Sequence, residues 1–92
     1  MPRFRPFFTK AASKGFARMQ KRGKDLSRFR EVILRLQEGE KLDPRFRAHP
    51  LKGKYAGEYE CHIEPDWLLI YHYEGDRLVL TEMGTHAELF DL

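Results

Sequence analysis

The chain has 92 residues, enough for one hydrophobic core and too few for two, so we expect a single domain spanning residues 1–92. A hydrophobic content of 41% favours a folded domain over disorder, and a single cysteine cannot form an internal disulfide. We see neither a secretory signal nor an apolar run of bilayer length, so we expect a cytoplasmic location. The net charge of +3 conceals an uneven distribution, because residues 1–30 carry many Lys and Arg but a single acid, Asp25.

A short aromatic segment, Phe4 to Phe8, is the first expected element. It should form an edge strand, because Pro6 lacks the N–H that an inner strand needs. A helix should follow, capped by Thr9 or Ser13, since apolar residues then recur every three to four positions. Gly23 is expected to end this helix.

A second helix is predicted by one apolar stripe at helical spacing, after a cap at Asp25 or Ser27 and before Gly39. The link between the two helices is short, so they should form an antiparallel hairpin. Many basic residues lie on this hairpin, which suits an RNA backbone or an acidic partner, although a solvated helix surface has the same composition. The apolar stripe consists of Leu26, Phe29, Val32, Ile33 and Leu36.

Residues 40–54 are rich in turn-forming residues and should form a loop. Three strands are expected next. In residues 58–64 apolar and polar residues alternate, so one side should be buried, with Cys61 as a structural thiol, and the other should carry His62. Residues 67–73 form an almost continuous apolar strand, and a hairpin turn leads into the strand at residues 77–83. Residues 85–90 are expected to form one helical turn.

The order β-α-α-β-β-β predicts an α+β domain, in which a helical hairpin covers one face of an antiparallel sheet. The opposite face is left free for function. His62 should lie on that face, and the hairpin turn should bring Asp66 near it. His86 follows the last strand and His49 ends the long loop, so both are expected to converge on His62. His72 lies within the apolar strand and is left out of the candidate site.

This set of side chains suits acid–base cleavage of RNA without a metal or cofactor. A histidine can take a proton from the 2′-hydroxyl or give one to the 5′-oxygen, while a carboxylate such as Asp66 fixes a tautomer or acts as base. Trp67 and Phe90 could stack on bases, although either could equally be a core aromatic, and each histidine could be a surface or capping residue. A zinc site is disfavoured, because Cys61 and His62 should point to opposite faces of the strand.

Three motifs in the second half of the chain closely resemble the YafQ group of RelE/ParE-type toxins. The matching segments are His49-Pro50-Leu51-Lys52-Gly53, then Cys61-His62-Ile63-Glu64-Pro65-Asp66-Trp67-Leu68-Leu69-Ile70-Tyr71, and finally Gly84-Thr85-His86-Ala87-Glu88-Leu89-Phe90. Each piece is weak by itself, and the combination at this spacing is specific. The first half agrees in organisation without a diagnostic motif.

The resemblance implies a RelE-like fold and a bacterial type II toxin that cleaves mRNA in the ribosomal A site. By position, His49, His62, Asp66 and His86 match the family's acid–base and phosphate-contacting residues. Trp67 and Phe90 match aromatic residues of its active site. The basic helices would face ribosomal RNA. The implied partners are the ribosome, mRNA and a cognate DinJ-like antitoxin with a ribbon-helix-helix portion, through which alone the pair would contact operator DNA.

Two departures from the family pattern bear on activity. Tyr59 and Met83 stand where many relatives have arginine, which removes fixed positive charge that could stabilise a phosphorane. Lys52, Lys54 or the protonated histidines could replace it. The departures leave open a weak or silent toxin that only binds antitoxin and represses its operon, and a gyrase poison of the ParE branch is a further alternative. The pattern also leaves open which group is the acid and which the base.

Overall fold

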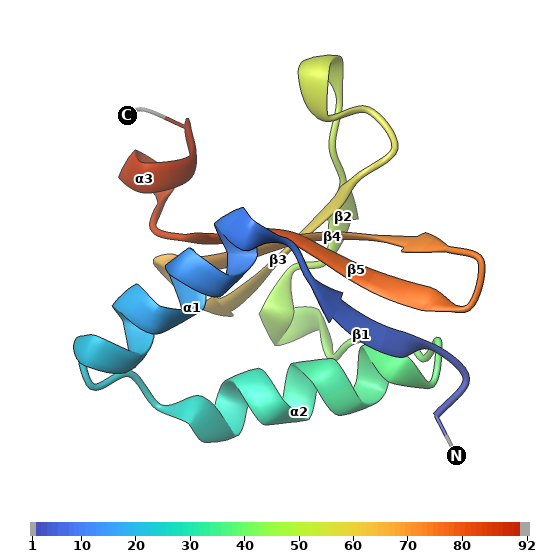
Figure 1. Ribbon diagram of the computed structural model, residues 1–92, viewed down its shortest axis with the longest axis horizontal. Coiled ribbons are helices and arrows are strands. Elements are labelled where there is room, and N and C mark those ends of the chain that lie inside the picture. Colours follow the sequence, from blue (N-terminus) through green and yellow to red (C-terminus); the bar gives the residue numbers. More distant parts are fainter. Residues whose placement is uncertain (1, 91–92) are drawn as a thin grey trace.

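The computed structural model describes residues 2–90 and confirms the α+β class and the predicted order of the main elements. Two helices lie against one face of a five-stranded sheet of order β1-β5-β4-β3-β2 (Figure 1). The elements are β1 (Arg5–Phe8), α1 (Lys10–Lys21), α2 (Leu26–Gln37), the 3-10 turn η1 (Pro44–Phe46), β2 (His49–Pro50), the 3-10 turn η2 (Gly53–Tyr55), β3 (Tyr59–Glu64), β4 (Trp67–Glu74), β5 (Arg77–Gly84) and α3 (His86–Phe90). The segment expected as a plain loop therefore contains β2 and both 3-10 turns.

The sheet is mixed, which corrects the expectation of a fully antiparallel sheet. Strands β2 to β5 pair antiparallel, but the edge strand β1 pairs parallel to β5, with Phe7 opposite Val79. Tight turns impose antiparallel pairing on neighbouring strands of a hairpin. No turn joins β1 to β5, because the rest of the domain lies between them in sequence, so their relative direction is set by packing alone.

The helix caps resolve the alternatives that the sequence offered. Thr9 caps α1, since its hydroxyl accepts from the N–H of Ala12 at 3.0 Å and donates to the carbonyl of Thr81 at 2.7 Å. This second bond ties the start of α1 to β5. Asp25 caps α2 by accepting from the N–H of Ser27 at 2.9 Å. Ser13 and Ser27 are thus not the caps.

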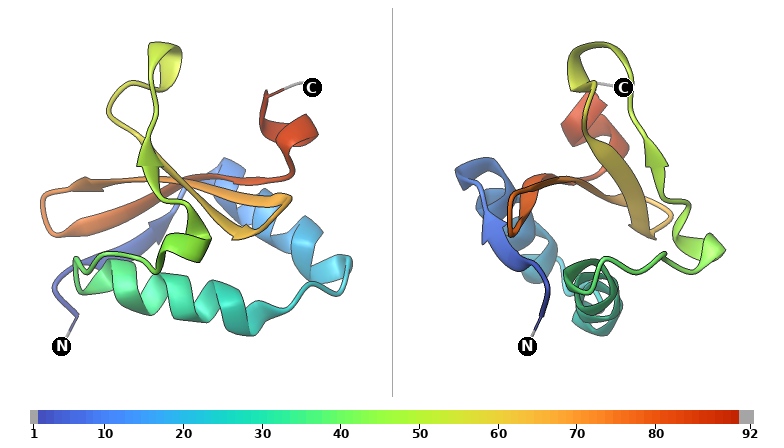
Figure 2. Two further views of the ribbon diagram at one scale, coloured as in Figure 1. Left: turned by 180° about the vertical axis from the view of Figure 1, so that it is seen from behind. Right: turned by 90° about the vertical axis from the view of Figure 1, so that its right-hand side faces the viewer.

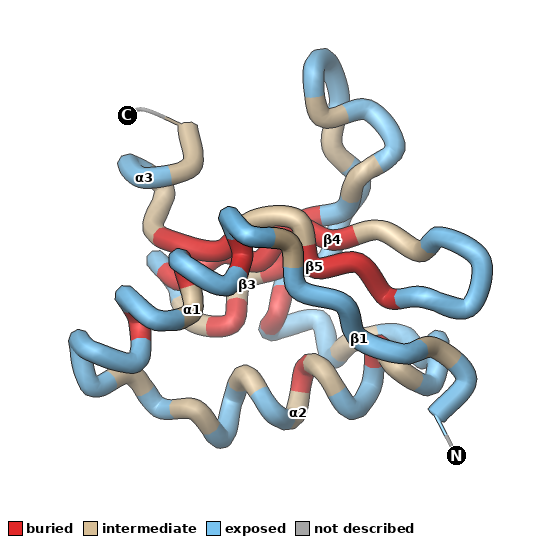
Figure 3. Tube along the Cα trace, viewed as in Figure 1, coloured by how far each residue is buried: buried red, intermediate tan, exposed pale blue. Residues whose placement is uncertain are grey.

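The main core lies between the sheet and the helices α1 and α2, where the buried residues concentrate (Figure 3). At Gly15 the helix α1 touches β5 so closely that a Cβ atom there would lie 1.9 Å from the carbonyl oxygen of Met83. Cys61 is fully buried, as expected, and burial raises the pKa of its thiol. The largest fully buried side chains of this core are Trp67, Phe46, Met19, Ile63, Leu69, Leu78, Leu80 and Met83.

The opposite face of the sheet, called here the active face, is bordered by α3 and by the loop containing η2. Both stand on the side of the sheet away from α2 (Figure 2). Their aromatic rings meet, since the centroids of Tyr55 and Phe90 are 5.8 Å apart. None of the helices in the described part of the chain combines the length and hydropathy needed to cross a bilayer.

Candidate active site

Three histidines meet at the active face, and we call them the histidine cluster: His49 on β2, His62 on β3 and His86 at the start of α3. His62 is central, with its ring centroid 6.4 Å from that of His49 and 5.5 Å from that of His86. The structure therefore brings together side chains that the sequence placed on three separate elements. His72, left out of the candidate site, lies apart and contacts Glu58 at 2.9 Å.

Asp66 holds His86 by two hydrogen bonds. One carboxylate oxygen of Asp66 lies 2.7 Å from Nδ1 of His86 and accepts from the backbone N–H of His86 at 2.9 Å. These bonds hold the pKa of Asp66 below its ordinary value, so the carboxylate stays ionised. Nδ1 of His86 is thereby occupied, and Nε2 is the ring atom left for proton transfer.

The sequence placed Asp66 near His62, but the bonding partner is His86. The reason is local, since the pairing of β3 with β4 shifts register between His62 and Glu64 just before the turn. Such an irregularity re-aims the side chains beside it. Asp66 is therefore directed to the residue that follows β5, across the end of the sheet.

A second carboxylate, Glu60, links the other two histidines and was missed by the sequence argument. One oxygen of Glu60 lies 3.3 Å from Nε2 of His49 and 3.3 Å from Nε2 of His62. Glu60 is buried, and it is the one charged residue so placed between residues 2 and 90. The alternation of residues in β3 could have revealed Glu60, because it places this side chain on the same side of the strand as His62.

The ring of His49 has acceptors at both nitrogens. Its Nδ1 lies 2.8 Å from the backbone carbonyl oxygen of Arg47, and its Nε2 faces the Glu60 carboxylate. A carbonyl oxygen accepts only, so Nδ1 must carry a proton. The Nδ1 proton thus holds the ring in place, with Nε2 turned toward the Glu60 carboxylate.

The helix α3, which carries His86, is fixed to α1 through Glu88. The Glu88 carboxylate contacts Arg22 at 2.7 Å and Arg18 at 3.1 Å, and it accepts from the N–H of Thr85 at 2.9 Å. The Thr85 hydroxyl accepts in return from the N–H of Glu88 at 3.2 Å. This is a capping box, which Thr-x-x-Glu in the sequence could have revealed. The arginine contacts lower the pKa of Glu88 to about 2.

The four residues expected to bind RNA fall in different places. Trp67 is fully buried and stacks on Phe29 in the main core, which corrects its expected role as a surface for base stacking. Its strand position has the phase of the residues that face the helices, so the core position is the one adopted. Lys52 and Lys54 are exposed on the η2 loop, and Phe90 is partly exposed at the end of α3.

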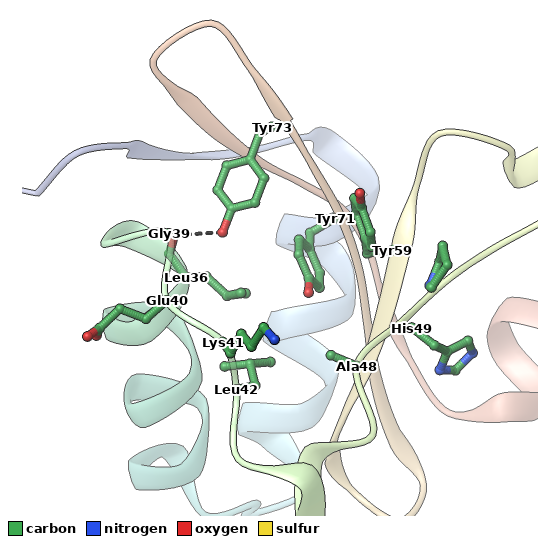
Figure 4. Close-up of a pocket in the computed structure, with 11 residues that line it drawn as sticks. Leu36, Gly39, Glu40, Lys41, Leu42, Ala48, His49, Tyr59, Tyr71 and Tyr73 are labelled. Carbon is green, nitrogen blue, oxygen red and sulfur yellow. Dashed lines mark hydrogen bonds between the residues drawn. The ribbon is translucent and has the colours of Figure 1, made fainter.

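A cavity lies apart from the active face, at the edge of the sheet next to β2. It has a volume of about 490 Å³ and shares only His49 with the histidine cluster. Three tyrosines, Tyr59, Tyr71 and Tyr73, line it, and the Tyr73 hydroxyl donates to the carbonyl of Leu36 at 2.8 Å (Figure 4). Tyr59 therefore faces this cavity. Met83 is fully buried and offers nothing to the site.

Comparison with known proteins places this geometry in a family. Residues 4–91 match the model of the family described as bacterial toxin of type II toxin-antitoxin system, YafQ. The chain is 37% identical over 79 residues to the mRNA interferase toxin YafQ of Escherichia coli strain K12, a match that covers 85% of this chain and 86% of that protein.

Solved structures agree with this match. The structure of the E. coli DinJ-YafQ toxin-antitoxin complex gives a TM-score of 0.86 at 32% identity, covering 96% of this chain and 98% of the other. A copper-bound mutant toxin from Helicobacter pylori gives a TM-score of 0.91 at 42% identity, covering 95% and 99%. In residues 2–90 of this chain no three His, Cys, Asp or Glu side chains are arranged to hold a metal ion.

Proposed function

Since the chain belongs to the YafQ family of bacterial type II toxins, and is thus an mRNA interferase, we propose that it cleaves mRNA in the ribosomal A site by acid–base chemistry. It would act in the cytoplasm as one domain and stop translation. The observation that supports this best is the geometry of the histidine cluster, in which two carboxylates hold three imidazoles within reach of one another.

In the proposed reaction the groups divide the work. Asp66 holds His86 through Nδ1 and leaves Nε2 free, so His86 is the proposed acid that protonates the 5′-oxygen as it leaves. His62, in contact with Glu60, is the proposed base for the 2′-hydroxyl. His49, held between the Arg47 carbonyl and Glu60, would contact a phosphate oxygen as charge develops on the phosphorane. No step in this scheme needs a metal ion.

Outside the cluster, Lys52 and Lys54 are proposed to contact the RNA backbone, and Phe90 to stack on a base beside the cleaved bond. The complex of E. coli YafQ with DinJ supports a cognate DinJ-like antitoxin as the partner of this chain. In this proposal the antitoxin carries the ribbon-helix-helix portion, and the toxin meets operator DNA only through it.

Primer extension on a reporter mRNA in a reconstituted translation reaction tests the proposal. Wild type should produce cuts in phase with codons that require ribosomes. His86→Gln should reduce cleavage at least about 100-fold, the usual contribution of a general acid. His72→Gln is the matched control, because it makes the same exchange at the histidine outside the cluster and should leave cleavage unchanged.

Two other outcomes would contradict the proposal. Folded wild-type chain that binds its antitoxin but leaves mRNA intact would identify it as the silent partner. Linearised plasmid in the presence of gyrase, with intact mRNA, would identify a gyrase poison. The intact proton-transfer groups favour the nuclease over both, since neither alternative uses them.

A further inference from the structure

A second cavity adjoins the histidine cluster and is rich in arginine. It has a volume of about 360 Å³ and lies where η1, α2 and the end of β3 meet. His62 and His86 line one part of it, and three arginines, Arg28, Arg45 and Arg47, line the rest. We call this cavity the arginine pocket. The sequence did not single out these arginines, because Arg28 lies on a helix with many other cations and Arg45 and Arg47 lie just outside the matching segment that begins at His49.

The positive charge in the arginine pocket is only partly compensated. Arg45 contacts Glu31 at 2.6 Å, so its charge is largely balanced. Glu64, the one acid that lines the pocket, contacts Lys24 at 3.6 Å. Arg28 and Arg47 have no carboxylate within ion-pair distance in the described part of the chain. Two guanidinium groups are therefore available to an anion from outside.

The backbone at Arg47 adopts an uncommon conformation. Its φ of 50° and ψ of 44° are left-handed, and no other residue except glycine has a positive φ in residues 2–90. Its N–H donates to the carbonyl of Pro44 at 3.0 Å, which closes η1, and its own carbonyl accepts from Nδ1 of His49. Glycine would adopt this conformation without strain, so an arginine here carries a cost that a phosphate contact would justify.

We propose that the arginine pocket binds the backbone phosphate of mRNA next to the one that is cleaved, with Arg47 and Arg28 as the donors. This inference rests on the proposed function. It places fixed positive charge next to the cleaved phosphate, in a chain where neither Tyr59 nor Met83 can supply any. A guanidinium suits the task, because its planar array of N–H donors matches the oxygens of a phosphate.

The decisive variant is Arg47→Gly. It removes the guanidinium but keeps the backbone that holds His49, so the midpoint of thermal unfolding should stay unchanged or rise as the strain is relieved. Cleavage of ribosome-bound mRNA should fall about ten- to hundredfold, the value of one charge-assisted hydrogen bond. Arg77→Ser, at the far end of β5, removes the same charge and should leave cleavage unchanged.

Binding of a short RNA that carries 2′-O-methyl groups, and so cannot be cut, separates this inference from the proposed function. Fluorescence anisotropy at several salt concentrations gives the slope of the logarithm of the binding constant against the logarithm of the salt concentration. This slope should be less steep in Arg47→Gly than in wild type by about 0.7, which corresponds to the loss of one phosphate contact. An unchanged slope, or no measurable binding by wild type, would contradict the proposal that the arginine pocket binds a phosphate. If the slope is less steep in Arg47→Gly but wild type cuts no mRNA, the proposed function is wrong and the phosphate-binding role of the arginine pocket is kept.

Discussion

Glu60 and Asp66 hold the histidines of the cluster in different ways. Asp66 is exposed and bonds both the ring and the backbone of His86, so it fixes the position of the ring as well as its tautomer. Glu60 is buried and shares one oxygen between His49 and His62. A buried carboxylate that serves two rings strengthens any charge on them, because the surroundings screen it poorly.

Replacement of Glu60 by Gln tests that assignment. The amide keeps the shape of the side chain but removes the negative charge between the two rings. The imidazolium that His62 forms when it accepts the proton then has no counter-ion, so cleavage should fall at least about tenfold. Glu58→Gln is the matched control, since Glu58 bonds His72 outside the cluster. Equal activity in both variants would remove Glu60 from the mechanism.

The sequence predicted the members of the histidine cluster but not how they are bonded. His49 and His86 stand at element ends, Asp66 stands in a turn and His62 lies on the outward side of β3, and the order of elements was enough to bring them to one face. Glu60 was overlooked because a glutamate on the polar side of a strand is usually solvated, and only the pairing of β2 with β3 buries it. Trp67 was misplaced because alternation within a continuous apolar strand cannot be read from its sequence.

Among the secondary-structure elements, the helix α3 matters most to the site because it carries His86. It has only five residues, too few to be stable alone, and it is held by the Thr85–Glu88 capping box and by the contacts of Glu88 with Arg18 and Arg22. Sequence patterns predicted the helical turn and the two long helices with their caps. They could not predict the parallel pairing of β1 or the strand β2, which depend on contacts between distant parts of the chain.

Glu88→Gln should loosen α3 and reveal its electrostatic anchor. The pKa of Glu88 falls from 4.5 to about 2 on folding, so the carboxylate adds stability above pH 4.5 and loses it as the pH falls toward 2. Because the arginines are partly exposed, we expect a loss of about 1 kcal/mol at neutral pH. Thermal unfolding across that pH range checks this, and the two proteins should converge near pH 2.

The matched control for this variant is Glu40→Gln, which removes an exposed carboxylate 3.7 Å from Arg35. It should change stability little at any pH, as surface pairs usually do. The rate of cleavage by Glu88→Gln should fall even at temperatures where the variant is fully folded, because a loosened α3 also displaces His86. If both variants unfold alike, Glu88 does not anchor α3.

At the scale of the whole molecule, the domain presents different chemistry on its two sides. The active face carries the histidine cluster with its carboxylates, whereas α1 on the other side presents a stripe of cations. Lys10, Lys14 and Lys21 lie on the exposed side of α1, while Arg18 and Arg22 are occupied by Glu88. Under the proposed function, such a stripe would contact ribosomal RNA, independently of the chemistry at the histidine cluster.

The double variant Lys14→Glu, Lys21→Glu tests the role of this stripe. Neither side chain packs in the core, so the fold should be retained, but the rate of cleavage at low concentrations of ribosomes should fall steeply as salt is raised. Saturating ribosomes should restore the rate, because the site itself is unchanged. The control is Lys41→Glu, Arg77→Glu, which alters the net charge equally on surfaces away from α1. If both double variants lose the same activity, net charge rather than the α1 stripe governs ribosome binding.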